Sequence, residues 1–185
     1  MKPVLVGLVA GGLLFCPSAP ATNTAQLKAD AEAKVQTFAK TLKGELLTAI
    51  NQGGLVNAID VCNLKAPAIA AQLSTDGWSV KRTALRVRNP ANAPDDWERN
   101  VLDYFSATMA KQPATPSIQA TSVDAAPFRY MQTIKTGQLC LACHGSNLSA
   151  DVQTALKKRY PQDQATGFKL GDLRGAFSLQ YEGPL

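Results

Sequence analysis

Two cysteines and a histidine in the last third of the chain have the spacing that attaches haem covalently to protein. Cys140 and Cys143 are separated by two residues, and His144 follows directly. This separation suits the two vinyl groups of a haem, so thioether bonds would hold the ring and the histidine would become an axial ligand of the iron. His144 is the single histidine among 185 residues. The sequence therefore predicts one covalently bound haem c.

Three other interpretations of this run fit its surroundings less well. A thioredoxin-like dithiol needs the motif to open a helix early in a βαβ unit, whereas this motif follows a strand-like segment late in the chain. A structural zinc ion would need Cys62 together with Cys140, Cys143 and His144, a sparse set for a tetrahedral site. A plain disulfide would leave His144 without a role. Haem attachment accounts for the whole motif.

The axial position opposite His144 stays open when only the residues are considered. Bis-histidine ligation is excluded, so the position is empty or filled by Cys62, Met109, Met131, a lysine or a tyrosine. Methionine would raise the reduction potential, and a thiolate would lower it. Met109 falls on the apolar face of a predicted helix, where methionine usually fills the core, and Met131 falls on a predicted strand whose buried face the pattern does not define. A cysteine is also often buried without any other role. Cys62 is nevertheless the odd cysteine once the motif and the N-terminal segment are set aside, which makes it a candidate ligand.

Arginine side chains form a second candidate feature. Arg82, Arg86 and Arg88 alternate with apolar residues in a segment, 78–88, that has the pattern of a strand. Such a row is usually a solvated face. The functional alternative is that one or more of them pairs with haem propionates, because a guanidinium fork suits a carboxylate.

Residues 1–21 have the pattern of a secretory signal peptide. Lys2 is a short charged start, the apolar run from Val4 to Phe15 follows, and Ala19-Pro20-Ala21 is a small-x-small cleavage site. We therefore expect a mature domain over residues 22–185 that is periplasmic or secreted. The apolar run is too short to span a bilayer and no later run is longer, so no membrane span is expected.

Charge and composition narrow the function classes. Removal of residues 1–21 takes away Lys2 alone, which lowers the formal net charge from +5 to about +4. The basic residues are dispersed, so we expect no nucleic-acid site. The mild positive excess favours an acidic partner or an anionic surface, and the expected partner is a redox or signalling protein. No second histidine is available as a distal acid or base, so we expect no peroxidase-like enzyme.

Hydrophobic periodicity outlines the elements that must position the motif. A long amphipathic helix is predicted over 26–51 and ends at Gly53-Gly54. A second helical segment over 55–64 carries Cys62, and Pro67 is expected to begin a third that ends at Leu73.

The remainder mixes strands with short helices. Asp95 and Glu98 form a capping box that begins the next helix. A proline-bearing connection is expected over 111–127, and a further helix over 149–160. Strands are predicted over 78–88, 128–134 and 173–181. This order of elements indicates an α+β fold with an antiparallel sheet.

Four segments together resemble a known family. They cover nearly all of the mature chain and are 58–62 with Ala66-Pro67, 82–98, 140–145, and 160–161 with 165–168 and 171–176. On these segments the chain resembles the periplasmic or lumenal mono-haem c domain with a PAS-like fold, the Tll-like haem domain family, which also forms the sensor portion of some membrane histidine kinases. The resemblance implies a PAS-like antiparallel sheet with a long N-terminal helix and flanking helices.

The resemblance also bears on the iron ligands and on function. It implies that Cys62 is the second axial ligand. The expected function is then a secreted mono-haem cytochrome of the c type, acting in redox sensing or low-potential electron transfer. The alternative is a sensor of gases or small ligands, in which Cys62 is displaced from the iron. With neither a membrane span nor a kinase domain, a signal would have to pass to a separate protein.

Overall fold

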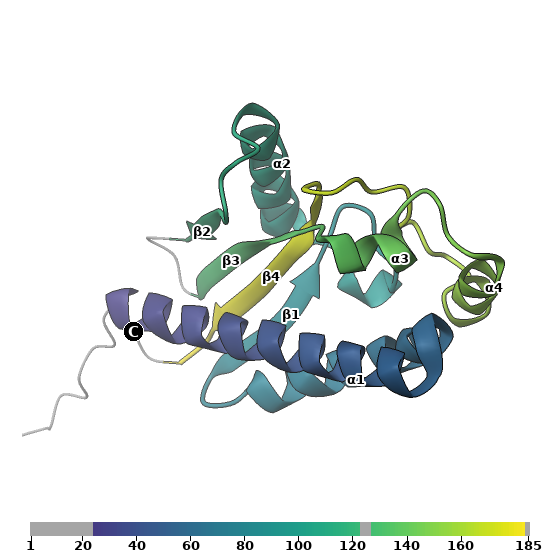
Figure 1. The fold of residues 1–185 in the computed structure, drawn as a ribbon. Coiled ribbons are helices and arrows are strands. Elements are labelled where there is room, and N and C mark those ends of the chain that lie inside the picture. The colour runs from purple at the N-terminus through teal and green to yellow at the C-terminus, as the bar shows by residue number, and fades with distance from the viewer. Residues whose placement is uncertain (1–23, 123–126, 184–185) are drawn as a thin grey trace, which may run out of the picture.

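A four-stranded antiparallel sheet forms the centre of the molecule, with helices on both of its faces (Figure 1). The computed structural model describes residues 24–122 and 127–183, so the predicted signal peptide lies outside the described residues. The strands are β1 (Trp78–Thr83), β2 (Gln119–Thr121), β3 (Phe128–Lys135) and β4 (Leu173–Tyr181), arranged in the order β1-β4-β3-β2. The predicted α+β class is confirmed.

Helix α1 (Thr24–Leu73) covers one face of the sheet. Its first half places apolar side chains three or four positions apart, so they share one face of the helix. The most buried of these are Leu27, Ala31, Val35 and Phe38. They pack against the sheet side chains Trp78, Val80, Phe128, Tyr130, Phe177 and Leu179. The main core of the protein therefore lies between α1 and the sheet.

The predicted break at Gly53-Gly54 is present, but the predicted break at Pro67 is not. Gly54 has a φ of +72°, which a residue with a side chain rarely adopts, and the helix changes direction there. Pro67 lies inside the last segment of α1, so the second and third predicted helices are one. Pro67 is exposed, whereas Ala66 and Ile69 beside it are buried. Packing of this segment outweighs the backbone hydrogen bond that proline removes.

Strand β1 ends at Thr83, five residues earlier than the sequence predicts. Its last pairing with β4 joins Thr83 to Ala176. The next residue outward on β4 is Gly175, with a φ of +156°, and a Cβ atom there would overlap the carbonyl oxygen of Thr83. The chain then leaves the sheet and forms a short 3₁₀ turn, η1 (Pro90–Asn92). The proline-bearing connection also differs from prediction, because it contains the edge strand β2.

Helix α2 (Asp96–Lys111) packs on the opposite face of the sheet through Leu102 and Phe105. The predicted capping box is present: Asp95 accepts a hydrogen bond from the backbone nitrogen of Glu98, and Glu98 accepts one from that of Asp95. Both cap positions satisfy backbone groups that a helix leaves unpaired at its start.

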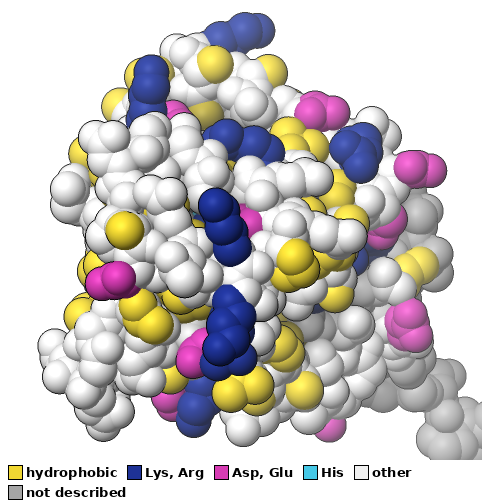
Figure 2. Space-filling model, turned by 90° about the vertical axis from the view of Figure 1, so that its right-hand side faces the viewer, with side chains coloured by type: hydrophobic (Ala, Val, Ile, Leu, Met, Phe, Trp, Pro, Cys, Tyr) yellow, Lys and Arg dark blue, Asp and Glu magenta, His cyan; other side chains and the backbone are white. Residues whose placement is uncertain are grey.

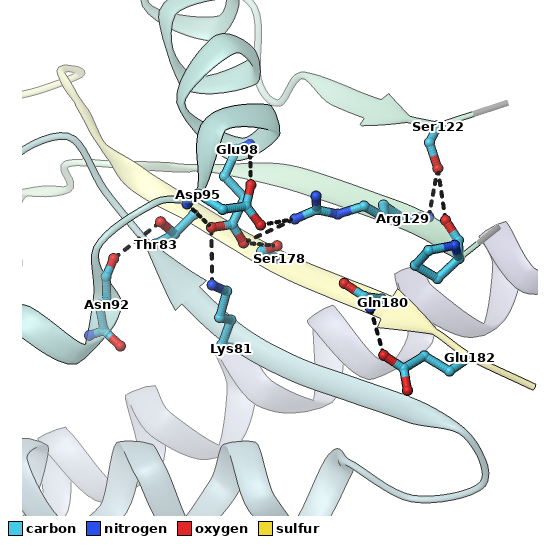
Figure 3. A network of polar contacts seen from close by, with 11 residues as sticks. Lys81, Thr83, Asn92, Asp95, Glu98, Ser122, Arg129, Ser178, Gln180 and Glu182 are labelled. Atoms are coloured by element: carbon cyan, nitrogen blue, oxygen red, sulfur yellow. Dashed lines mark hydrogen bonds and ion pairs between the residues drawn. The ribbon is translucent and has the colours of Figure 1, made fainter. Parts of the chain in front are cut away.

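Glu98 also ties α2 to three strands, as Figure 3 shows. Its carboxylate is fully buried. It lies 3.0 Å from Nζ of Lys81 on β1 and 3.7 Å from Nη2 of Arg129 on β3, and accepts a hydrogen bond of 2.6 Å from Ser178 on β4. A buried carboxylate is stable only when it is paired in this way.

The motif lies at one end of the sheet, in a 3₁₀ turn η2 (Gln138–Cys140) that continues into the short helix α3 (Leu141–His144). Helix α4 (Ala150–Arg159) follows, capped by Ser149 as predicted. Arg159 on α4 forms a two-pronged ion pair with Asp60 on α1, which joins the two helices beside the motif. Within the described ranges, no helix has the length and apolar character needed to cross a bilayer.

Candidate haem site

The two motif cysteines lie on one helical turn. Cys140 and Leu141 both have right-handed helical backbone angles, so η2 runs directly into α3. Residues three positions apart on a helix lie on the same face, which places Cys143 on the same side as Cys140. Both thiols are free and half-buried. The turn therefore presents two thiols together, as attachment to one planar group requires.

His144 is held in the tautomer that can bind a metal. Its Nδ1 atom lies 2.6 Å from the carbonyl oxygen of Ala165, and a carbonyl can only accept, so Nδ1 carries the proton. Its Nε2 atom lies 3.5 Å from Nε of Arg174, which donates to it. Burial, followed by the charges of Arg174 and Arg88, lowers the pKa of His144 to about 2. The imidazole is therefore neutral, and its Nε2 atom carries the lone pair that a metal would bind in place of the contact with Arg174.

A strap formed by residues 163–168 holds the motif from behind. The backbone nitrogen of Gly167 donates to the carbonyl oxygen of Gly145, and that of Phe168 donates to the carbonyl oxygen of His144. Gly145 fits tightly, because a Cβ atom there would overlap the carbonyl oxygen of Leu141. With the contact to Ala165, the strap fixes both the backbone and the ring of the histidine.

Arg88 joins the strap to the motif. Its guanidinium donates to the carbonyl oxygens of Cys143 (2.5 Å) and Ala165 (3.2 Å), and its Nε donates to Asp163 (3.1 Å). The side chains of Arg88 and Asp163 are only 12% and 10% exposed, so water screens this pair little. Asp163 also accepts a hydrogen bond from the backbone nitrogen of Ala165. Arg88 thus has a scaffold role at the site.

Cys62 is brought to the motif by the last segment of α1. It is half-buried, and burial raises the pKa of its thiol, while the charges of Arg82 and Arg88 act in the opposite direction. Burial likewise raises the pKa of Cys143, and the thiol of Cys62 adds to that effect. The segment of α1 that carries Cys62 packs on the motif, because Leu55 and Ile59 belong to the same apolar cluster as Cys143. Tyr160, whose pKa is raised by burial and by Cys62, completes this side of the site.

The methionines that the sequence also allowed as ligands lie elsewhere. Met131 is fully buried against Leu102 and Phe105, in the core between α2 and the sheet. Met109 is buried on α2. Of the ligands considered by name, the structure brings Cys62 to the motif and buries Met131 in the core, whereas Met109 lines a cavity that also borders Arg174.

The three arginines do not form one row, because only Arg82 belongs to β1. Arg82 lies over the ring of Phe38, at 5.6 Å. Arg86 is exposed and stacks on the ring of Phe168 at 3.7 Å, with Nη1 bonded to the carbonyl oxygen of Thr166. The prediction that one strand over 78–88 carries all three arginines on one side is therefore wrong, because the chain leaves the sheet after Thr83.

Arg174 is the residue of the site that the sequence patterns did not single out. It follows the first residue of β4, and burial, followed by the charges of Arg88 and Arg82, lowers its pKa to about 10. Its position beside His144 depends on a β-bulge between β3 and β4 at Ile134 and Lys135, which no local pattern signals. The role of Ala165 was equally hidden, because its carbonyl oxygen makes the contact.

A cavity of about 700 Å³ opens beside Arg174. Its walls come from the end of α2, the segment after β1 and the start of β4, and include Arg86, Met109, Phe168 and Leu170. This volume is in the range of pockets for organic ligands. On the neighbouring outer face, at the end that carries α3 and α4, basic side chains are interspersed with acidic ones (Figure 2).

The zinc and disulfide interpretations gain no support from the site. Across the described residues, no group of three or more His, Cys, Asp and Glu side chains is arranged to hold a metal ion. Cys140 and Cys143 are not joined to each other. A haem would need only the two thiols for attachment and one or two axial ligands, and the thiols on one turn with a neutral, oriented imidazole fit that requirement.

Fold and site together define a class of protein, an α+β domain that presents a Cys-x-x-Cys-His turn at the end of an antiparallel sheet. Residues 19–181 match the Tll0287-like family, and the chain belongs to that family. Among solved structures it is similar to the cyanobacterial haem protein Tll0287, with 24% sequence identity and a TM-score of 0.61, over 89% of this chain and 99% of that one. No curated protein sequence matches.

Proposed function

We propose that this protein is an exported mono-haem cytochrome of the c type, periplasmic or secreted. In this proposal Cys140 and Cys143 carry the haem through thioether bonds, and His144 is an axial ligand. The observation that carries it is the fixed tautomer of His144, whose Nδ1 donates to Ala165 while Nε2 is unprotonated. A haem-binding relative within the same family supports the choice of haem over other metals.

We assign the second axial position to Cys62. Its support is the approach of α1 to the motif, where Ile59, one turn before Cys62, belongs to the same apolar cluster as Cys143. Burial raises the pKa of the Cys62 thiol, and the charges of Arg82 and Arg88 act in the opposite direction, toward the thiolate, which is the form that binds iron. When bound, a haem with histidine and thiolate ligands supplies one-electron chemistry at low potential.

The function proposed for this centre is redox sensing or low-potential electron transfer. The carbonyl oxygen of Ala165 orients the imidazole, and Arg88 links the strap to the motif. The side chains of His144 and Cys62, the two proposed ligands, are both half-buried. His144, the single histidine of the sequence, is assigned to the iron and is therefore not available as a distal acid or base, so we propose a carrier or sensor that acts through a redox or signalling partner protein and not an enzyme.

The pyridine haemochrome spectrum of the protein, exported in a host that attaches haem c, tests this proposal. We expect the α-band position of a haem bound through two thioethers and one haem per chain. A spectrum of non-covalent haem b, or no haem in the folded protein, would overturn it. The matched control is Cys140→Ala/Cys143→Ala, which should lose the attached haem.

A further inference from the structure

We propose that Arg82 and Arg174 are the two cations that pair with the haem propionates, whereas Arg88 belongs to the protein scaffold. This inference rests on the proposed haem attachment and goes beyond it, because it assigns the carboxylate partners. It also replaces the simple expectation that the arginines nearest in sequence share one role.

The guanidinium of Arg88 already has partners within the protein. Its guanidinium bonds to one carboxylate, Asp163, and to the carbonyl oxygens of Cys143 and Ala165. The positive charge of Arg88 is thereby neutralised at short range. Pairing with a propionate would require the link between motif and strap to break.

Among the described residues, Arg82 and Arg174 have no carboxylate partner of this kind. Throughout the residues that the structure describes, no carboxylate oxygen lies within 4.0 Å of either guanidinium. Arg82 contacts the ring of Phe38 and no hydrogen-bond acceptor is found for it in that part of the chain. Arg174 contacts only neutral groups, namely Nε2 of His144, the carbonyl oxygen of Arg86 at 3.3 Å and the ring of Phe168 at 5.3 Å.

Two half-buried cations without anions are energetically unfavourable, because removal from water is not offset by an opposite charge. The two propionates of one haem supply two negative charges. Their carboxylates match the fork of a guanidinium, which can donate two parallel hydrogen bonds. The number and the chemistry of the unpaired cations therefore agree with the group that the motif would hold.

The positions of Arg82 and Arg174 in the fold also support their assignment to the propionates. Arg174 lies beside the proposed iron ligand, with its Nε atom 3.5 Å from Nε2 of His144, and Arg82 lies on β1, the strand that pairs with β4. Arg174 also lines the cavity of about 700 Å³, so an anionic group can reach it from that side. The inner position of Arg82, under α1, and that of Arg174, at the cavity, provide two separate anchoring points.

Resonance Raman spectra and reduction potentials of single-site variants test the assignment. The propionate bending bands report the hydrogen bonds made by the carboxylates. We expect these bands to shift in Arg82→Gln and in Arg174→Gln and to recover in part in Arg82→Lys and Arg174→Lys, which keep the charge but lose the fork. The reduction potential should fall in both glutamine variants, because loss of a nearby positive charge favours ferric iron.

The matched control is Arg99→Gln, which removes an exposed arginine of α2 and should change neither the bands nor the potential. Unchanged bands in both Arg82→Gln and Arg174→Gln, in protein with attached haem, would overturn this inference and leave the proposed function intact. If a glutamine variant does not fold, the lysine variant at that position replaces it, and its bands should shift less than in a glutamine variant but still differ from the wild type, because the guanidinium fork is lost. Absence of attached haem in the wild-type protein would overturn both proposals, and the pyridine haemochrome spectrum distinguishes that result.

Discussion

Arg88 and Asp163 form an ion pair with a nitrogen–oxygen distance of 3.0 Å that links the Cys-x-x-Cys-His turn to the strap behind it. The strap also supplies the carbonyl oxygen of Ala165 that orients His144. Stability of this end of the molecule and orientation of the imidazole therefore depend on the same pair.

We expect Asp163→Ala to destabilise the protein by about 3 kcal/mol, because it leaves the charge of Arg88 unpaired in a partly buried position. Urea denaturation monitored by circular dichroism measures the change. Asp151→Ala, at an exposed position on α4, is the control and should have a small effect. Equal stabilities of the two variants would show that the pair does not hold the strap.

Cys62→Ala should change the optical and electron paramagnetic resonance spectra of the ferric protein. The proposed ligation predicts a low-spin thiolate signature in the wild type that is lost in the variant, since alanine offers no ligand. The reduction potential should rise at the same time, because a thiolate stabilises ferric iron. The control is Met109→Ala, which removes another candidate ligand and should keep the low-spin thiolate signature of the wild type. If the spectra of Cys62→Ala were the same as those of the wild type, Cys62 would not be a ligand of the iron.

Carbon monoxide separates the two candidate functions. A haem whose sixth ligand stays in place on reduction should show no change in the Soret band under millimolar CO. Cys62→Ala should show that change, which makes it the positive control. A CO-induced change in the wild-type ferrous protein would instead favour the sensor of gases or small ligands, in which Cys62 leaves the iron.

Glu98→Ala should destabilise the fold without changing the haem ligands. The variant removes the buried carboxylate that Lys81, Ser178 and Arg129 share (Figure 3), and we expect a loss of about 3 kcal/mol. The exposed carboxylate of Glu182, bonded only to Gln180 by its side chain, gives the control Glu182→Ala, for which the expected change is below about 0.5 kcal/mol. Denaturant midpoints compare the two. A similar midpoint for both variants would contradict the network's role.

Features that depend on neighbouring residues in the sequence were predictable. The capping box of Asp95 and Glu98, the Ser149 cap and the break at Gly53-Gly54 are present as expected. Each is specified within a few residues, by a side chain that caps a helix or a glycine that permits a positive φ. The helix over 26–51 was equally clear, because its apolar face repeats with the helical period.

Features set by tertiary packing were not predictable. Pro67 is a local signal to begin a helix, but burial of Ala66 and Ile69 keeps α1 continuous there. The end of β1 depends on the geometry of Gly175, which is distant in sequence.

The site shows the same division. The motif was evident from its spacing, and a resemblance to a family pointed to Cys62. The partners that orient His144 were not evident, because Ala165 acts through its backbone and Arg174 reaches the imidazole only when β4 forms beside β3. Arg82, Arg86 and Arg88 were grouped by alternation, but the chain leaves the sheet between them, so each makes different contacts.

Intact mass spectrometry of the exported protein after acid–acetone extraction tests the central claim most directly. Extraction removes non-covalent haem but not haem held by thioether bonds. We expect that the colour stays with the polypeptide and that its mass exceeds that of the mature chain by one haem, with both Cys140 and Cys143 modified. A colourless polypeptide with the mass of the unmodified chain would contradict it.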